Sequence, residues 1–313
     1  MLWIELLLLA FGFLLLVKGA DWFVEGSSGV ADKFGIPQLV IGLTIVAMGT
    51  SAPEAAVSIT AALKENAGIT VGNVVGSNIL NIFIILGIAS IITPIAVAKT
   101  TIRYEIPIML AATLLLLGFG YIGGTLNLLE GILLWICFAG YLGYMFVMCR
   151  KGQMQVEEVE KVDSPIWKLL VQGAIGLVLV VWGSSVTVNA ATNIATMFEI
   201  DDRFIGLTIV ALGTSLPELF TSVVAARKGK ADIAIGNIVG SNIFNILFVV
   251  GTSALITPVA FESKFVIDCI VAILAGIVLW LCVFRKRKLT RTGGIFILAC
   301  YAIYFLYLFF FSL

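Results

Sequence analysis

Long apolar runs, separated by short polar segments, cover the chain from end to end. A helix that crosses a membrane needs about 20 predominantly apolar residues, and small polar residues extend the shorter runs toward that length. The pattern predicts an all-α polytopic membrane protein with ten transmembrane helices, although eight or eleven would also fit. The ten runs are Leu2–Val17, Val40–Ala47, Ile79–Ile92, Ile106–Phe119, Leu126–Cys149, Trp167–Val188, Phe204–Leu212, Ile243–Ile256, Phe265–Phe284 and Gly293–Leu313.

The composition agrees with a membrane protein. Of the 313 residues, 60% are hydrophobic and only 12% are charged, whereas a soluble domain carries about 25% charged residues. The first run lacks the basic start and the A-x-A site of a signal peptide, so we interpret it as the first span. A formal net charge of zero argues against nucleic-acid binding. There is no histidine, which excludes a histidine metal site or proton relay, and the five cysteines form no C-x-x-C and are interpreted as packing residues.

One stretch of sequence occurs twice. The string GLTIVAMGTSAPEAAVSI at 42–59 matches GLTIVALGTSLPELFTSV at 206–223 at 12 of 18 positions. The string TVGNVVGSNILNIFIILG at 70–87 matches AIGNIVGSNIFNILFVVG at 234–251 at 10 of 18. Both pairs are offset by 164 residues, which indicates an internal duplication. We expect a first five-helix repeat at 1–149 with its motif at 42–87, and a second at 166–313 with its motif at 206–251.

The two repeats are expected to be inverted. Five spans is an odd number, so the second repeat must enter the membrane from the opposite side, as in many secondary transporters. With the N-terminus outside, fifteen Lys and Arg residues fall in inside loops and three fall outside, while Lys18 lies within the first span. The positive-inside rule then places both termini outside the cell membrane and makes the polar segment 150–165 a cytoplasmic linker.

The second and seventh spans each carry a proline followed by a glutamate. Pro53 and Pro217 remove a helix hydrogen bond, and discontinuous helices 2 and 7 would offer freed carbonyls to cations. Glu54 and Glu218 come next in the chain. A carboxylate at mid-membrane costs roughly 2.5 kcal/mol or more, and no Lys or Arg other than Lys18 lies at comparable depth. A bound cation is the natural partner of the two glutamates.

Further oxygen ligands follow from helical spacing. Residues three and four positions before each glutamate share its helix face; they are Ser51, Thr50, Ser215 and Thr214. Polar residues also recur every four positions in the third and eighth spans, at Asn73, Ser77, Asn81, Asn237, Ser241 and Asn245. We assign Asn73 and Asn237 to helix packing and the rest to the site. All these ligands are hard oxygens, which suit Ca²⁺, Na⁺, Mg²⁺ or K⁺, and a flexible dehydrating cage favours Ca²⁺ over Mg²⁺. Two carboxylates balance one Ca²⁺, several monovalent ions or two protons, and such competition is the basis of exchange.

The motifs GTSAPE and GTSLPE, each followed by GNVVGSN or GNIVGSN, resemble the α-repeats of the Ca²⁺/cation antiporter superfamily, and above all its prokaryotic sodium/calcium exchangers. The resemblance extends over essentially all ten spans. It implies Na⁺-driven Ca²⁺ transport by alternating access, with three Na⁺ exchanged for one Ca²⁺. It also implies that the first and sixth spans slide past a core of eight helices.

The resemblance also implies roles for individual residues. Glu54 and Glu218 would hold Ca²⁺, helped by the backbone carbonyls of Thr50 and Thr214. The flanking Na⁺ sites would use Ser51, Ser77, Ser215 and Ser241 with the carbonyls of Ala47 and Ala211. Asn81 and Asn245 would close the centre of the site.

Two departures from other branches narrow the expected substrates. The potassium-dependent branch has an acidic residue where this chain has Asn245, so K⁺ co-transport is not expected. Proton/calcium exchangers typically have Asn where this chain has Thr50 and Thr214, which weighs against that branch. A H⁺/Ca²⁺ antiporter and a cation channel stay as alternatives, whereas an enzyme is not expected because the polar residues come in matched pairs. We expect no cofactor and no obligate protein partner, and a functional monomer.

Overall fold

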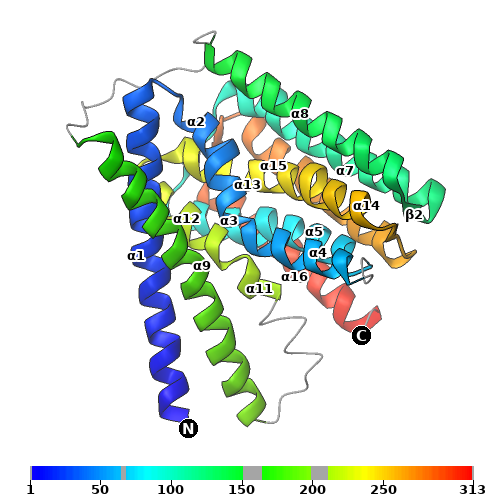
Figure 1. The fold of residues 1–313 in the computed structure, drawn as a ribbon, viewed down its shortest axis with the longest axis horizontal. Helices are drawn as coiled ribbons and strands as arrows, with labels where there is room; N and C mark the ends of the chain where they lie inside the picture. Colours follow the sequence, from blue (N-terminus) through cyan, green and yellow to red (C-terminus); the bar gives the residue numbers. More distant parts are fainter. Residues whose placement is uncertain (1, 65–67, 151–163, 199–210, 312–313) are drawn as a thin grey trace.

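The computed structural model describes residues 2–64, 68–150, 164–198 and 211–311, and helices dominate it (Figure 1). Helices are labelled α and π-helical turns η. The elements of the first half are α1 (Leu2–Phe34), α2 (Gln38–Ile41), η1 (Gly42–Val46), α3 (Ala47–Thr50), α4 (Ala52–Leu63), α5 (Gly68–Leu80), η2 (Asn81–Leu86), α6 (Gly87–Ile92), β1 (Ile95–Ala96), η3 (Thr101–Glu105), α7 (Ile106–Gly123), β2 (Thr125–Leu126) and α8 (Leu128–Arg150).

The elements of the second half are α9 (Ile166–Met197), α11 (Ala211–Thr214), α12 (Leu216–Arg227), α13 (Ala231–Phe244), η5 (Asn245–Val250), α14 (Gly251–Ile256), β3 (Val259–Ala260), α15 (Lys264–Phe284), β4 (Lys288–Leu289) and α16 (Arg291–Phe311). Several elements recur at the offset of the sequence repeat. The turn η5 begins 164 residues after η2, and α12 begins 164 residues after α4.

The structure accounts for most of the expected membrane spans. In the described part of the chain, eight helices are long and apolar enough to cross a membrane, and Gln38–Thr50 with Ala52–Leu63, bent by 51°, makes a ninth. Residues 199–210 lie outside the described part and contain most of the expected seventh span. The count of ten therefore stays a prediction, as does the linker, since residues 151–163 are also outside the described part.

Both expected helix breaks are present, but each comes before its proline. The helix stops at Thr50, and Ser51 leaves helical geometry with φ −80° and ψ 7° before α4 begins. In the second half Ser215 has φ −89° and ψ 4° between α11 and α12. Pro53 and Pro217 thus lie in the first turn of a new helix, where a missing N–H costs no hydrogen bond.

The helical segments Gly68–Ile92 and Ala231–Ile256, which come after α4 and α12 in the chain, form the centre of the molecule. In the most apolar stretches of Gly68–Ile92 and Ala231–Ile256, 72% and 94% of the residues are buried. The backbone of η1 packs closely on α13: a Cβ at Gly240 would lie only 2.6 Å from the carbonyl oxygen of Leu43. Away from the exposed ends at Ile69, Ile92 and Ile256, most side chains on these elements therefore meet other protein groups or a bound ligand.

The two longest helices form a pair of their own. In Figure 1, α1 and α9 lie side by side and cross the direction of α7 and α8. Glycines bring the two backbones together, since a Cβ at Gly176 would lie 2.3 Å from the Phe23 nitrogen and one at Gly26 would lie 2.4 Å from the Gly173 nitrogen. A small apolar cluster of Leu16, Ala20 and Val180, separate from the main core, packs against α12.

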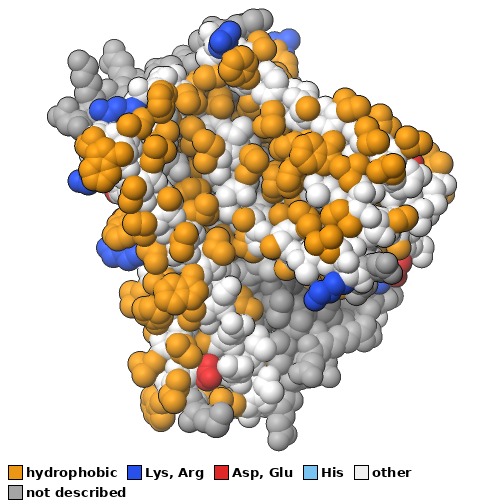
Figure 2. All heavy atoms as spheres, viewed as in Figure 1, with side chains coloured by type: hydrophobic (Ala, Val, Ile, Leu, Met, Phe, Trp, Pro, Cys, Tyr) orange, Lys and Arg blue, Asp and Glu red, His pale blue; other side chains and the backbone are white. Residues whose placement is uncertain are grey.

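Two short antiparallel pairings connect the halves of the chain. The strand β1 pairs with β4, and β2 pairs with β3, so each pairing joins one strand from each half. Hydrophobic side chains are spread over the face in Figure 2, and most of the Lys and Arg side chains in this view lie along its upper and left edges. Such a surface suits a protein whose solvent is mainly lipid.

Candidate functional site

Glu54 and Glu218 lie in the first turns of α4 and α12, directly after the two helix breaks. Each residue is only 1% exposed. A helix N-terminus carries a partial positive charge, which favours a carboxylate at that position. The two breaks are therefore followed directly by two acidic side chains that lie deep inside the protein, as the sequence predicted, whereas the use of freed carbonyls as ligands stays a prediction.

Each glutamate accepts a hydrogen bond from a serine of the opposite break. Ser51 Oγ donates to Glu218 Oε1 at 2.9 Å, and Ser215 Oγ donates to Glu54 Oε1 at 3.5 Å. Helical spacing predicted that each serine faces the glutamate of its own span. Because the helix breaks at the serine itself, the hydroxyl reaches the other glutamate instead. This crossing brings the two carboxylates into one site.

Asn81 and Asn245 are held in place by two asparagines that the sequence reasoning did not select. Asn81 Nδ2 donates to Asn242 Oδ1 at 2.9 Å, and Asn245 Nδ2 donates to Asn78 Oδ1 at 3.1 Å. Asn78 and Asn242 in turn each donate to the other's backbone carbonyl at 3.1 Å. Their signal was present in the sequence, since both belong to the repeated string VGSN.

Four buried oxygen atoms of this site have no hydrogen-bond partner within the described part of the protein. They are Glu54 Oε2, Glu218 Oε2, Asn81 Oδ1 and Asn245 Oδ1. A buried acceptor without a partner costs about 1–3 kcal/mol, and more if it is charged. The amide nitrogens of both asparagines are already used, so their oxygens, like the ionised carboxylates, remain as acceptors of the kind that bind cations.

The chemistry of the donor set fits a hard cation. Among the described residues, no group of three or more His, Cys, Asp or Glu side chains could hold a metal ion. Any cation here must therefore combine the two carboxylates with amide, hydroxyl or backbone oxygens, a mixture typical of Ca²⁺ ligands.

The expected Na⁺ ligands are partly brought together. Ser241 Oγ donates to the carbonyl of Ala47 at 3.3 Å, joining α13 to α3 across the two halves. Ser77 is buried on α5, which contacts α11, the helix that begins at Ala211. Thr50 is fully buried and its hydroxyl contacts Asn237 Oδ1 at 3.0 Å, while Thr214 ends α11 just before the second break.

Asn73 and Asn237 have the packing role that was expected of them. Asn73 Nδ2 donates to the Glu54 carbonyl at 3.2 Å and to Ser58 Oγ at 2.9 Å. Asn237 makes the same two contacts, to the Glu218 carbonyl at 3.4 Å and to Ser222 Oγ at 2.9 Å. The amides fasten α5 to α4 and α13 to α12, and so fix the helices that carry the glutamates.

The fold and this site define a class of membrane cation transporter, and comparison with known proteins identifies the family. A family model described as "Sodium/calcium exchanger protein" matches residues 4–147 and 168–310. The chain therefore belongs to the sodium/calcium exchanger family, whose substrates are Na⁺ and Ca²⁺, and the resemblance seen in the sequence is confirmed.

Relatives match along nearly the whole chain. The inner membrane protein YrbG of Escherichia coli is 37% identical, over 87% of this chain and 88% of that protein. The sodium/calcium exchanger MaX1 of Methanosarcina acetivorans is 31% identical, over 99% of this chain and 100% of that protein. A solved structure of the sodium-calcium exchanger NCX_Mj matches with a TM-score of 0.86 and 32% identity, over 98% of this chain and all of that one.

Proposed function

We propose that this protein is a secondary active transporter that exchanges Na⁺ for Ca²⁺ across the cell membrane by alternating access. The observation that carries the proposal is a set of four buried oxygens, on Glu54, Glu218, Asn81 and Asn245, that have no hydrogen-bond partner among the described residues. The two amide oxygens can only accept, and the two carboxylate oxygens accept when the glutamates are ionised. Membership of the sodium/calcium exchanger family supports the choice of ions.

Ca²⁺ binds between the two carboxylates, which balance its charge. Glu54 and Glu218 are the main ligands, and the backbone carbonyls of Thr50 and Thr214 complete the shell. Na⁺ ions replace Ca²⁺ at flanking positions, which use Ser51 and Ser77 on one side and Ser215 and Ser241 on the other, together with the carbonyls of Ala47 and Ala211. The contact of Ser241 with the Ala47 carbonyl supports a flanking site formed by both halves.

Three Na⁺ are exchanged for one Ca²⁺, so transport is electrogenic. With both glutamates ionised, one Ca²⁺ leaves the site neutral, whereas three Na⁺ leave it with one positive charge. An empty site keeps two buried negative charges, which are costly to move through a membrane. The site therefore crosses only when it is loaded, and this couples the two fluxes.

The chain folds as two inverted five-helix repeats, 1–149 and 166–313, joined by a cytoplasmic linker, with both termini outside, and it functions as a monomer. The recurrence of η2 and η5, and the crossed pairing of β1 with β4 and β2 with β3, support the internal symmetry. The pair α1 and α9 is the moving part. Its glycine-mediated packing brings the two backbones into direct contact and favours movement of α1 and α9 as one body.

The test is ⁴⁵Ca²⁺ uptake into proteoliposomes with outward gradients of Na⁺, K⁺ and H⁺ imposed one at a time. We expect saturable uptake with the Na⁺ gradient only. Uptake that persists with a H⁺ gradient and no Na⁺ would assign the site to H⁺/Ca²⁺ antiport. Uptake that needs no counter-ion, and that Na⁺ cannot drive uphill, would indicate a channel.

A further inference from the structure

A charged cavity lies between α1 and the end of α12. Its volume is about 340 Å³, and it is lined by Val17, Lys18, Asp21, Val224, Arg227 and Lys228. Arg227 follows Glu218 by nine residues on the same helix, or about 13 Å at 1.5 Å per residue, so this cavity is distinct from the ion site. Three of its six lining side chains are cationic and one is anionic, which leaves a surplus of positive charge.

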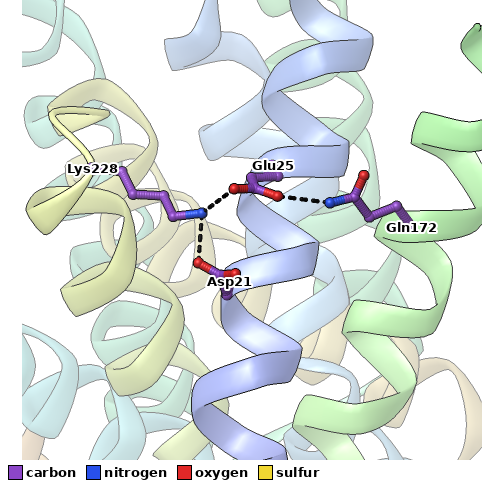
Figure 3. Close-up of polar contacts among 4 residues, drawn as sticks. All are labelled: Asp21, Glu25, Gln172 and Lys228. Carbon is purple, nitrogen blue, oxygen red and sulfur yellow. Dashed lines mark hydrogen bonds and ion pairs between the residues drawn. The ribbon is translucent and has the colours of Figure 1, made fainter. Parts of the chain in front are cut away.

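One of the three cations is already neutralised. Lys228 Nζ lies 2.6 Å from Asp21 Oδ1 and 2.6 Å from Glu25 Oε1, and Gln172 Nε2 of α9 donates to Glu25 Oε2 at 2.8 Å (Figure 3). Burial lowers the pKa of Lys228, but its hydrogen bonds to the two carboxylates outweigh burial and hold the pKa above its usual value. Lys228 is therefore charged and fully engaged with α1.

The other two cations have no such partner. Lys18 and Arg227 are both exposed, and neither forms an ion pair with any residue in the described part of the chain. Lys228 pairs with both Asp21 and Glu25, so these five charged side chains together carry one net positive charge, and Lys18 and Arg227 are the cations that remain free to bind a ligand. A ligand that matches them must be anionic and must reach both α1 and α12.

The position of the cavity along the helices identifies the membrane boundary. The helix α1 has 33 residues and is about 50 Å long, more than the roughly 30 Å of bilayer hydrocarbon. Before Lys18 the helix carries one charged residue, Glu5, and from Lys18 onward it carries five: Lys18, Asp21, Glu25, Asp32 and Lys33. The polar turn 227–230 after α12 lies beside the start of this charged part. We therefore place the cavity at the level where lipid headgroups meet the hydrocarbon.

We propose that this cavity binds the headgroup of an anionic phospholipid, with Lys18 and Arg227 contacting its phosphate. Basic pockets between membrane helices recognise such headgroups, and the planar guanidinium of Arg227 suits two phosphate oxygens. Val17 and Val224 supply apolar lining for the start of the acyl chains. Farther along the same two helices the rings of Phe13 and Phe220 lie 6.0 Å apart and continue the apolar surface. The bound lipid bridges α1 and the helix that carries Glu218.

The test is native mass spectrometry of the purified protein with equimolar phosphatidylglycerol and phosphatidylcholine of identical acyl chains. We expect preferential retention of phosphatidylglycerol. Because one basic residue near a membrane contributes about 1 kcal/mol, or roughly fivefold, Lys18→Gln and Arg227→Gln should each lower the preference about fivefold, and the double variant should lose nearly all of it.

Lys33→Gln is the matched control, since Lys33 is an exposed lysine in the last turn of the same helix but does not line the cavity. It should leave the preference unchanged. An undiminished preference in the double variant, or an equal loss in Lys33→Gln, would overturn the proposal. If the double variant cannot be purified, the unaltered protein still tests the proposal, because equal retention of phosphatidylglycerol and phosphatidylcholine would also overturn the proposal.

Discussion

Replacing Asn242 by alanine tests whether the asparagine network prepares the ion site. The substitution removes the acceptor of Asn81 Nδ2, which lies 2.9 Å away, and so releases the amide whose Oδ1 we assign to the ion. Loss of a contact that orients a metal ligand typically lowers affinity about 10- to 100-fold. The apparent Ca²⁺ affinity should fall by that factor, which corresponds to a loss of about 1.4–2.8 kcal/mol of binding free energy.

The assay is the Ca²⁺ concentration dependence of Na⁺-driven ⁴⁵Ca²⁺ uptake, measured for Asn242→Ala, Asn81→Ala and the double variant. If Asn242 acts through Asn81, the double variant should be no weaker than Asn81→Ala alone, because effects within one network are not additive. Thr113→Val in α7 removes another buried hydrogen bond, to the Met109 carbonyl, and should alter stability without altering Ca²⁺ affinity. Fully additive losses, or an unchanged affinity in Asn242→Ala, would refute the reasoning.

Three further outcomes are expected. Glu54→Gln and Glu218→Gln should each abolish Na⁺-driven ⁴⁵Ca²⁺ uptake while size-exclusion profiles stay normal. Intact exchange in either variant would show that the substituted glutamate is not a ligand of the ion site. With Na⁺ inside the vesicles, an inside-positive potential set with K⁺ and valinomycin should accelerate Ca²⁺ uptake, whereas a rate independent of potential would contradict the 3:1 exchange. Gly176→Leu should lower the melting temperature measured in detergent by the equivalent of about 1–3 kcal/mol or more, since its Cβ would lie 2.3 Å from the Phe23 nitrogen; Gly140→Ala, with no atom within 4 Å, should not.

The helix breaks show which features of the site could be predicted from the sequence and which could not. Proline and glutamate at matched positions predicted two discontinuous helices with buried carboxylates, and α3–α4 and α11–α12 have that form. Which glutamate each serine serves could not be predicted, because spacing rules assume one continuous helix. Once the backbone turns at Ser51 and Ser215, the direction of each hydroxyl depends on how the halves pack.

The partners within the asparagine network and the positions of the π-helical turns could not be predicted from the sequence, for a similar reason. The repeated string VGSN marks Asn78 and Asn242, but in the described part of the chain their side chains bond to groups about 160 residues away, so no local period shows which residues they hold. The turns η2 and η5 begin at the site asparagines themselves, yet an apolar run such as NIFIIL reads as ordinary helix. Such turns are frequent at functional sites because they redirect side chains and free carbonyls.

The sequence places Lys18 within the first span, as a charge at membrane depth. The proposed headgroup site would instead put Lys18 at the membrane boundary, beside the polar turn that follows α12. Hydropathy alone could not show this, because it does not reveal which part of a long helix lies in lipid.

The crossed serines bear on what half of this protein could do by itself. One half carries a glutamate and a serine, but the hydroxyl that bonds the glutamate comes from the other half. A polypeptide with only one repeat would leave its carboxylate without that donor and its serine without that acceptor. It could complete the arrangement only by meeting a second copy inserted in the opposite direction, as a dual-topology dimer. In the proposed inverted arrangement, joining the halves in one chain fixes their number at two and their orientations as opposite, so the protein need not rely on chance encounters in the membrane.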